Sequence, residues 1–210
     1  MITVIDYGMG NLRSVSKALE SLGAEVCVSN SPEDVARADK VILPGVGAFP
    51  AAMRELSARK LIEPIKSAIA SGKPYLGICL GLQLLFDYGE EGEGAAGLGI
   101  LKGRVKRFPN HSITQSLNHQ SLKIPHMGWN QVSTSHKTCP LLTEIPDGSF
   151  FYFVHSYYGD PADRSVVALE TEYGIRFASM VWRNNLYATQ FHPEKSQAVG
   201  LKLLRNFLDL

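Results

Sequence analysis

The 210-residue sequence lacks the marks of several protein classes. No stretch approaches the roughly 18 consecutive apolar residues of a membrane-spanning helix. Positive and negative charges nearly cancel to a formal net charge of +1, so we do not expect a nucleic acid or an anionic membrane as the main partner. Three cysteines are an odd number and too few for a disulfide framework in a chain of this length.

A signal peptide, repeats and linkers are missing as well. The opening residues, MITVIDYG, enter a strand-like segment without a basic start or a long apolar core, so we expect a cytoplasmic protein. No repeat, low-complexity tract or linker divides the chain. With 45% hydrophobic and 20% charged residues, residues 1–210 are expected to form one globular domain.

The first half of the chain alternates apolar runs with segments of helical spacing. The expected strands are 2–7, 24–29, 40–43 and 74–78, and helices are expected to begin near 12, 32, 49, 62 and 80, the last reaching Phe86. Parallel strands need crossover connections, and helices supply them, so this alternation predicts a mostly parallel sheet covered on both faces.

After a glycine-rich loop at 89–99 the pattern changes to short strands separated by turns. The expected strands are 103–108, 122–132, 149–158, 165–170, 175–182 and 186–191, followed by an amphipathic helix with Ser196 as its cap. We therefore expect an α/β fold, with a mostly parallel central sheet flanked by helices and a mixed or antiparallel β extension.

Cys79 has a glycine two places away on either side, in the sequence GICLG. Glycine serves where the backbone bends sharply or is approached closely. The cysteine falls where a buried strand should meet a helix, which is the form of a nucleophile elbow with cysteine in place of serine. The following helix would favour the thiolate. The alternative is a buried cysteine between two packing glycines. We assign no chemistry to Cys27 or Cys139.

A thiol nucleophile needs a base, and six histidines are available. Three lie in polar, turn-rich stretches (His111, His119 and His136), and two at expected strand ends (His126 and His155). His192 is the strongest candidate, because Glu194 stands two residues on and the intervening Pro193 should keep the segment extended. The carboxylate would then orient the imidazole. The alternative is a loop histidine beside a solvated glutamate.

A second glycine-rich turn, PGVG at 44–47, also follows a buried strand. The N–H of Leu80 and that of Val46 or Gly47 could together hold a tetrahedral oxyanion. Neither this turn nor GMGNLR at 8–13 completes the pattern G-x-G-x-x-G, so a nicotinamide cofactor is not expected. We expect no other cofactor and no metal.

The motifs PGVGAF, GICLGLQLLF and HPEKS, in this order and at these separations, resemble the class I glutamine amidotransferases. More narrowly, IDYGMGNLRSV, PHMGWN and FVHSYY resemble the glutaminase subunits of imidazole glycerol phosphate synthases, which serve histidine biosynthesis. The similarity covers nearly the whole chain. Residues 109–121 look longer than in that family, and we interpret them as a surface loop insertion.

The resemblance implies a Cys79–His192–Glu194 triad that hydrolyses L-glutamine through a γ-glutamyl thioester. It also implies a substrate site in which Gln83 and Glu91 contact glutamine, Glu91 at the α-amino group, while backbone at neighbouring positions holds the rest. Those positions are Gly45, His155, Ser156 and Tyr157.

The family further implies a heterodimer partner, a cyclase subunit of (β/α)₈-barrel fold that receives the ammonia. The cyclase joins ammonia to a ribonucleotide, giving imidazole glycerol phosphate and an aminoimidazole carboxamide ribotide. Ammonia in neutral water is mostly ammonium, which is not a nucleophile, so direct transfer between docked subunits is an advantage. Our candidates for the docking face are Asn11, Trp129, Tyr152 and Lys195, since Trp and Tyr are enriched at such contacts.

The glycines around Val46 suggest a control point. They lower the barrier to rotation of this peptide, so we hypothesise that one oxyanion donor points away until the partner is bound and loaded. Three other functions stay open: a glutaminase subunit of another synthase, such as that of pyridoxal phosphate synthesis, a stand-alone cysteine hydrolase, and a non-catalytic flavodoxin-like binding module.

Overall fold

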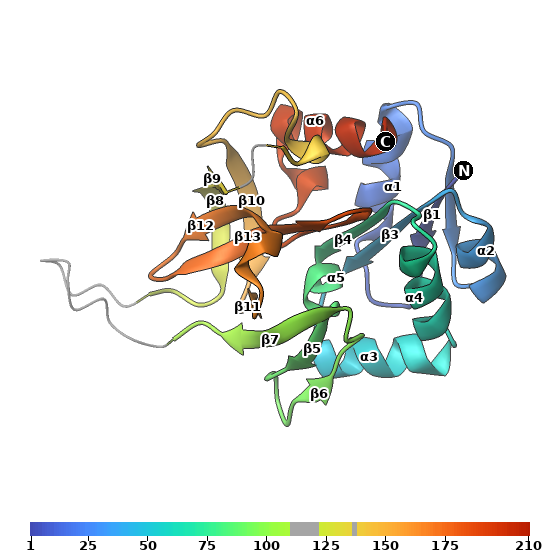
Figure 1. Ribbon diagram of the computed structural model, residues 1–210, viewed down its shortest axis with the longest axis horizontal. Coiled ribbons are helices and arrows are strands. Elements are labelled where there is room, and N and C mark those ends of the chain that lie inside the picture. The colour runs from blue at the N-terminus through green and yellow to red at the C-terminus, as the bar shows by residue number, and fades with distance from the viewer. Residues whose placement is uncertain (110–121, 136–137) are drawn as a thin grey trace, which may run out of the picture.

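The computed structural model describes residues 1–109, 122–135 and 138–210 (Figure 1). His111, His119, His136 and all but the first residue of the expected insertion at 109–121 lie outside the described residues. The helices are α1 (Leu12–Ser21), α2 (Pro32–Arg37), α3 (Phe49–Ala58), α4 (Ile62–Ala70), α5 (Leu80–Gln83) and α6 (Gln197–Leu208), and the 3-10 turns are η1 (Pro140–Leu142), η2 (Arg164–Val166) and η3 (Pro193–Lys195).

The central sheet has eight strands in the order β2-β1-β3-β4-β14-β13-β12-β9. The strands are β1 (Ile2–Ile5), β2 (Val26–Ser29), β3 (Lys40–Gly45), β4 (Tyr75–Cys79), β9 (Ser133–Thr134), β12 (Val167–Glu172), β13 (Arg176–Arg183) and β14 (Leu186–Thr189). Strands β2 to β14 in this order pair in parallel, and β14 to β9 pair antiparallel. The expected α/β fold, with its parallel part and its mixed extension, is confirmed.

Two smaller sheets stand beside the central one. Strand β10 (Phe150–His155) pairs with β8 (His126–Gln131), and β11 (Tyr157–Pro161) belongs to the sheet β11-β7-β5-β6, with β5 (Phe86–Gly89), β6 (Ala95–Ala96) and β7 (Leu101–Arg107). The single strand expected at 149–158 is therefore wrong. The chain changes sheets at Ser156, between β10 and β11.

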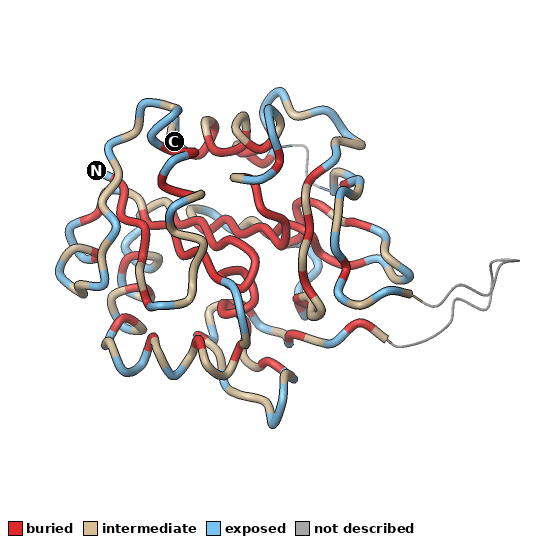
Figure 2. The backbone as a smooth tube through the Cα atoms, turned by 180° about the vertical axis from the view of Figure 1, so that it is seen from behind, coloured by how far each residue is buried: buried red, intermediate tan, exposed pale blue. Residues whose placement is uncertain are grey.

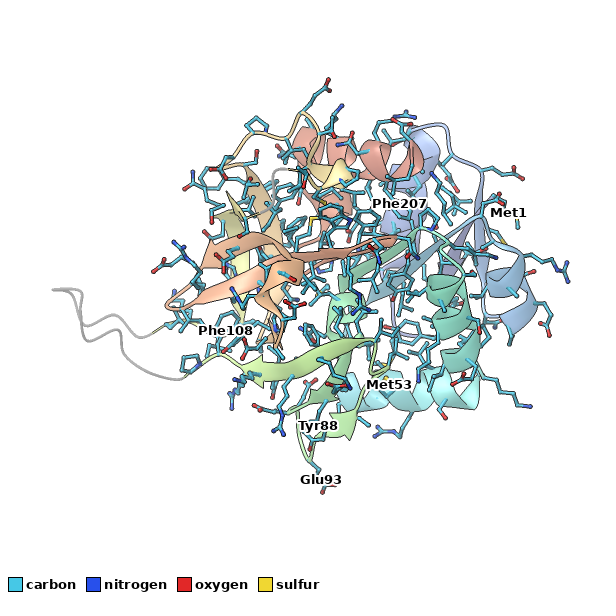
Figure 3. The ribbon with its side chains drawn as sticks, viewed as in Figure 1. Met1, Met53, Tyr88, Glu93, Phe108 and Phe207 are labelled. Carbon is cyan, nitrogen blue, oxygen red and sulfur yellow. The ribbon has the colours of Figure 1, made fainter. Side chains whose placement is uncertain are left out.

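The helices cover the sheet in two layers. Helices α1 and α6 lie together on one side, and α2 and α4 pack against each other, with α4 on the other side (Figure 1). The buried parts of the chain run through the middle between these layers (Figure 2). Phe207, labelled in Figure 3, packs from α6 onto the ring of Tyr187 in β14, 6.5 Å between centroids. No helix within the described ranges is long and apolar enough to cross a membrane.

Two local predictions fail for identifiable reasons. The helix expected to reach Phe86 ends at Gln83, because Phe86 starts β5, which pairs with β6 and β7. Ser196 stands at the N-terminus of α6, but its side chain accepts no hydrogen bond from that helix. By contrast, Ser31 caps α2 as its sequence predicts, accepting from the N–H groups of Glu33 and Asp34.

Candidate active site

Cys79 ends β4 in a conformation that few residues adopt. Its φ is 55° and its ψ is −107°, which confirms the expected strained turn. A Cβ atom on Gly77 would lie 2.6 Å from the carbonyl oxygen of Gly81, and one on Gly81 would lie 1.9 Å from that of Leu43. Both glycines are therefore required, since backbone atoms occupy the space that a side chain would need.

The helix after Cys79 is too short to favour a thiolate as strongly as its sequence position suggested. Helix α5 has only four residues, so it lacks the aligned peptides that would make a strong dipole at Cys79. The positive group that stabilises a thiolate here must come from a side chain.

The protonated imidazole of His192 is that group, and Glu194 holds it. The Nδ1 atom of His192 lies 2.8 Å from Oε1 of Glu194, and both side chains are buried. The expected extended segment is wrong, because Pro193–Lys195 form the 3-10 turn η3 after an extended His192. The turn nevertheless brings imidazole and carboxylate together.

His192 is tuned to carry a proton. Burial alone would lower its pKa, but Cys79 and Glu194 outweigh burial and raise the pKa of His192 to about 10. Nε2 of His192 is buried and has no hydrogen bond of good geometry among the described residues. Because Cys79 is the group that raises the pKa of this imidazole most, the sulfur is the group with which His192 can exchange a proton.

Strand β10 and the Ser196 hydroxyl together fix the backbone of the candidate base, His192. The N–H of His192 donates to the carbonyl oxygen of Tyr152 at 2.9 Å. The hydroxyl of Ser196 donates to the carbonyl of His192 at 2.7 Å and accepts from the N–H of Tyr152 at 3.0 Å. Ser196 thus orients the turn and does not cap α6.

A cavity of about 280 Å³ opens beside Cys79. Its wall contains every expected oxyanion and substrate residue except Gly45: Val46, Gly47, Leu80, Gln83, Glu91, His155, Ser156 and Tyr157. Pro125 and Val154 complete it and were not expected. Gly45 pairs with Cys79 in the sheet, where a Cβ would lie 2.4 Å from the Tyr7 hydroxyl.

Protein groups already hold several of these side chains. Glu91 accepts a hydrogen bond from the N–H of Phe49 at 2.6 Å, at the start of α3. Gln83 donates to the carbonyl of Tyr157 at 2.9 Å, and Nδ1 of His155 lies 2.8 Å from the same oxygen. His155 therefore belongs to the wall of the cavity, and the candidate base is His192.

The expected oxyanion donor at Val46 points elsewhere. Its N–H donates to the carbonyl oxygen of Met9 at 3.2 Å. Gly45 and Gly47 flank Val46, and Gly47 has a φ of +96°. A rotation of the Gly45–Val46 peptide would have to break the Met9 bond before this N–H could face the cavity.

Three of the four expected docking residues form one surface cluster. Trp129 on β8 is 46% exposed, and its ring lies 6.1 Å from that of Tyr152, edge to face. The ammonium of Lys195 lies 5.8 Å from the centre of the Tyr152 ring. Asn11 stands apart in sequence, at the N-terminus of α1, and α1 contacts η3.

The sequence reasoning missed Gln190. This residue is fully buried between β14 and His192, and its amide contacts the cysteine sulfur. A polar residue two places before the candidate base, at the end of the buried run LYAT, was the available signal.

Comparisons with known proteins agree with this geometry. The family model described as "Glutamine amidotransferase class-I" matches residues 3–210. "Imidazole glycerol phosphate synthase subunit HisH" of Syntrophotalea carbinolica is 52% identical over 210 residues, covering 100% of both chains. The protein of that name from Aromatoleum aromaticum is 53% identical, covering 99% of this chain and 97% of its own. The structure of PurLQS from Thermotoga maritima gives a TM-score of 0.73 at 19% identity, covering 99% and 97% of the two chains, which shows the fold alone.

Proposed function

The chain belongs to the class I glutamine amidotransferases, and we propose that Cys79, His192 and Glu194 release ammonia from L-glutamine for a docked cyclase. Relatives about half identical over the full length are named as imidazole glycerol phosphate synthase subunits. The chain is accordingly the glutaminase subunit of such a synthase, in histidine biosynthesis. We take residues 1–210 as one glutaminase domain.

In the proposed reaction, His192 takes the proton of Cys79 and the thiolate attacks the side-chain carboxamide carbon of glutamine. The tetrahedral oxyanion accepts hydrogen bonds from the N–H of Leu80 and, after rotation of its peptide, from that of Val46. His192 returns the proton to the leaving nitrogen, and ammonia departs. Water, deprotonated by His192, then hydrolyses the γ-glutamyl thioester to glutamate. Glu194 orients the imidazole throughout.

One observation carries the proposal: Cys79 borders the cavity and also raises the pKa of His192, whose other nitrogen is held by Glu194 at 2.8 Å. The wall supplies groups suited to an amino acid. Glu91 offers a carboxylate for the α-amino group, while Gln83 and the backbone at 155–157 complete the site.

The finer features of the partnership belong to the proposal as well. We take the partner to be a cyclase subunit of (β/α)₈-barrel fold, docked over Asn11, Trp129, Tyr152 and Lys195, that receives ammonia without exposure to bulk water. Cytoplasmic location fits three free cysteines, because reducing compartments keep thiols unpaired.

The test is the rate of glutamine hydrolysis by wild type and Cys79→Ala, each with and without the cyclase and its ribonucleotide. We expect hydrolysis that requires Cys79, with a loss of roughly 10⁴-fold or more in the variant, and that rises when the loaded cyclase is added. A stand-alone cysteine hydrolase would work at full rate alone, and a glutaminase of another synthase would respond to a different partner. A non-catalytic binding module would hydrolyse no glutamine under any of these conditions.

A further inference from the structure

The side chain of Gln190 lies against the sulfur of Cys79 in the core of the molecule. Its Nε2 atom is 3.7 Å from the sulfur, within hydrogen-bond range for sulfur, and the residue is fully buried. Its backbone N–H donates to the carbonyl of Ser179 at 2.8 Å, so strand β13 holds it in place. A buried amide costs stability unless its polar atoms are paired, so each of its contacts carries information.

The neighbouring groups dictate which end of the Gln190 amide faces the sulfur. The carbonyl of Tyr157 can only accept, so Gln83 must present its NH₂ group there, at 2.9 Å. The same NH₂ group also donates to Gln190, so Oε1 of Gln190 must be the acceptor, at 3.2 Å. The NH₂ group of Gln190 is then left for Cys79, and the sulfur faces a donor.

A buried pair of histidines, His126 and His155, fixes the hydrogen bonds of the Gln83 and Gln190 amides through the Tyr157 carbonyl. Nδ1 of His155 must donate to the Tyr157 carbonyl. The oxygen of Asn130 accepts from the N–H of Gln131, so its NH₂ group faces Nε2 of His126 at 3.2 Å and this nitrogen accepts. Nδ1 of His126 therefore donates to Nε2 of His155 at 3.0 Å. The chain of donors and acceptors leaves both rings neutral. The Tyr157 oxygen thus receives two hydrogen bonds, which hold Gln83 and, through it, Gln190.

Among the described residues, two uncharged polar groups within hydrogen-bond range of the sulfur differ in what they can do. The carbonyl of Val154 lies 3.9 Å away and can only accept, so it suits the neutral thiol. Gln190 can only donate at this position, so it suits the thiolate. Within the described part of the chain, the titratable groups coupled to the sulfur are His192 and Tyr7. Gln190 carries no charge, so it lends the sulfur a donor that does not depend on pH.

From this geometry we propose that Gln190 is a positioning residue for the nucleophile, whose amide N–H holds the Cys79 sulfur and stabilises its thiolate for attack on the substrate. This inference rests on the proposed function. In this proposal, the hydrogen-bonded chain Asn130–His126–His155 and the side chain of Gln83 together fix the orientation of the Gln190 amide.

The test is the pH dependence of Cys79 alkylation by iodoacetamide in the full chain bound to its loaded cyclase, followed by mass spectrometry of the peptide that contains Cys79. Gln190→Leu removes the donor at similar size, and Gln190→Glu keeps an acceptor for Gln83 but places an anion beside the sulfur. We expect the midpoint of alkylation to move to higher pH in both variants, by about one unit or more in Gln190→Glu. The glutaminase rate of each variant at pH 7 should fall to about one tenth of the wild-type rate or below.

Ser179→Ala is the matched control, because it changes a buried side chain of the same region whose hydroxyl makes no hydrogen bond within the described residues, to the sulfur or to any other group. It should keep the wild-type midpoint. If Gln190→Leu does not fold, Gln190→Met replaces it, since the unbranched thioether adapts to the same space. Rescue in Gln190→Asn is not expected, because the shorter amide cannot reach both Gln83 and Cys79.

The result that overturns the inference is a wild-type midpoint in the folded apolar variant, because the anion of Gln190→Glu would raise the midpoint whether or not the native amide donates to the sulfur. A wild-type complex that alkylates at Cys79 but hydrolyses no glutamine would instead contradict the proposed function. The two failures are distinguishable because alkylation reports on the sulfur alone, and hydrolysis of glutamine by wild type is measured in untreated aliquots of the same preparation.

Discussion

Two neighbouring strands end at the candidate site, and they end differently. At the end of β4, Gly77 and Gly81 are in close contact with backbone atoms, and Cys79 is held in a single strained conformation. At the end of β3, Val46 is 40% exposed and its N–H is bonded to Met9, away from the cavity. The proposed nucleophile is therefore held in place, whereas the proposed oxyanion donor at Val46 would have to turn to face the cavity.

This difference suggests a division of labour between the two turns. A fixed nucleophile avoids the cost of ordering the reactive group during each turnover. A donor that turns only in the assembled complex would prevent glutamine from being consumed without an acceptor for its ammonia.

The largest expected effect comes from filling the space at the fixed turn. In Gly81→Ala the new Cβ would meet the Leu43 carbonyl at 1.9 Å, so we expect a loss of roughly 3 kcal/mol or more in the free energy of unfolding. In Gly47→Ala the nearest atom is the end of the flexible Met9 side chain, and the positive φ costs about 1 to 2 kcal/mol. Urea denaturation measures both. Equal losses would mean that the two turns do not differ in packing.

The next effect concerns the N–H of Val46, the proposed oxyanion donor. Val46→Pro deletes the N–H, and the extended Gly45 before it tolerates a following proline. We expect the glutaminase rate of the loaded complex to fall by roughly 10²- to 10³-fold. Val46→Ala keeps the N–H and is the control that should retain activation. If Val46→Pro is activated as well as Val46→Ala, the donor lies elsewhere.

Acid should destabilise the pair of strands β8 and β10, which carry His126 and His155. Burial is the largest cause that lowers the pKa of His155 to about 3 and that of His126 to about 4, against 6.5 in the unfolded chain. The unfolded chain therefore binds more protons between pH 6.5 and about 4, and stability is lost as the pH falls through this window.

From pH 7 to 5 we expect a loss of roughly 1 to 2 kcal/mol for each histidine, measured by urea denaturation at both pH values. His126→Gln should lose about half as much. An equal loss in wild type and variant would show that other groups titrate.

The smallest effect is at the docking cluster. Trp129→Ala should weaken binding to the cyclase about tenfold, because half-exposed tryptophans often dominate interfaces. Val28→Ala is the control, since it truncates an exposed apolar residue on the edge strand β2. Calorimetric titration gives both dissociation constants, and equal values would remove Trp129 from the interface.

Local signals and chain topology account for what the sequence could predict. The Cys79 elbow and the Ser31 cap depend on residues within a few positions, so their sequences sufficed. The early end of α5, the sheet change at Ser156 and the role of Ser196 depend on pairing with distant strands, which periodicity does not report. Gln190 escaped notice because its partners, Cys79 and Gln83, lie more than 100 residues away in the chain.

The central claim, that Cys79 is the nucleophile, is tested most directly with a glutamine analogue that alkylates thiols. The full chain with its loaded cyclase is treated with this label, and every cysteine-containing peptide is examined by mass spectrometry. Our account predicts one adduct, on Cys79, together with loss of glutamine hydrolysis. An adduct only on Cys27 or Cys139, or an unmodified Cys79 in an enzyme that the label has inactivated, would contradict it.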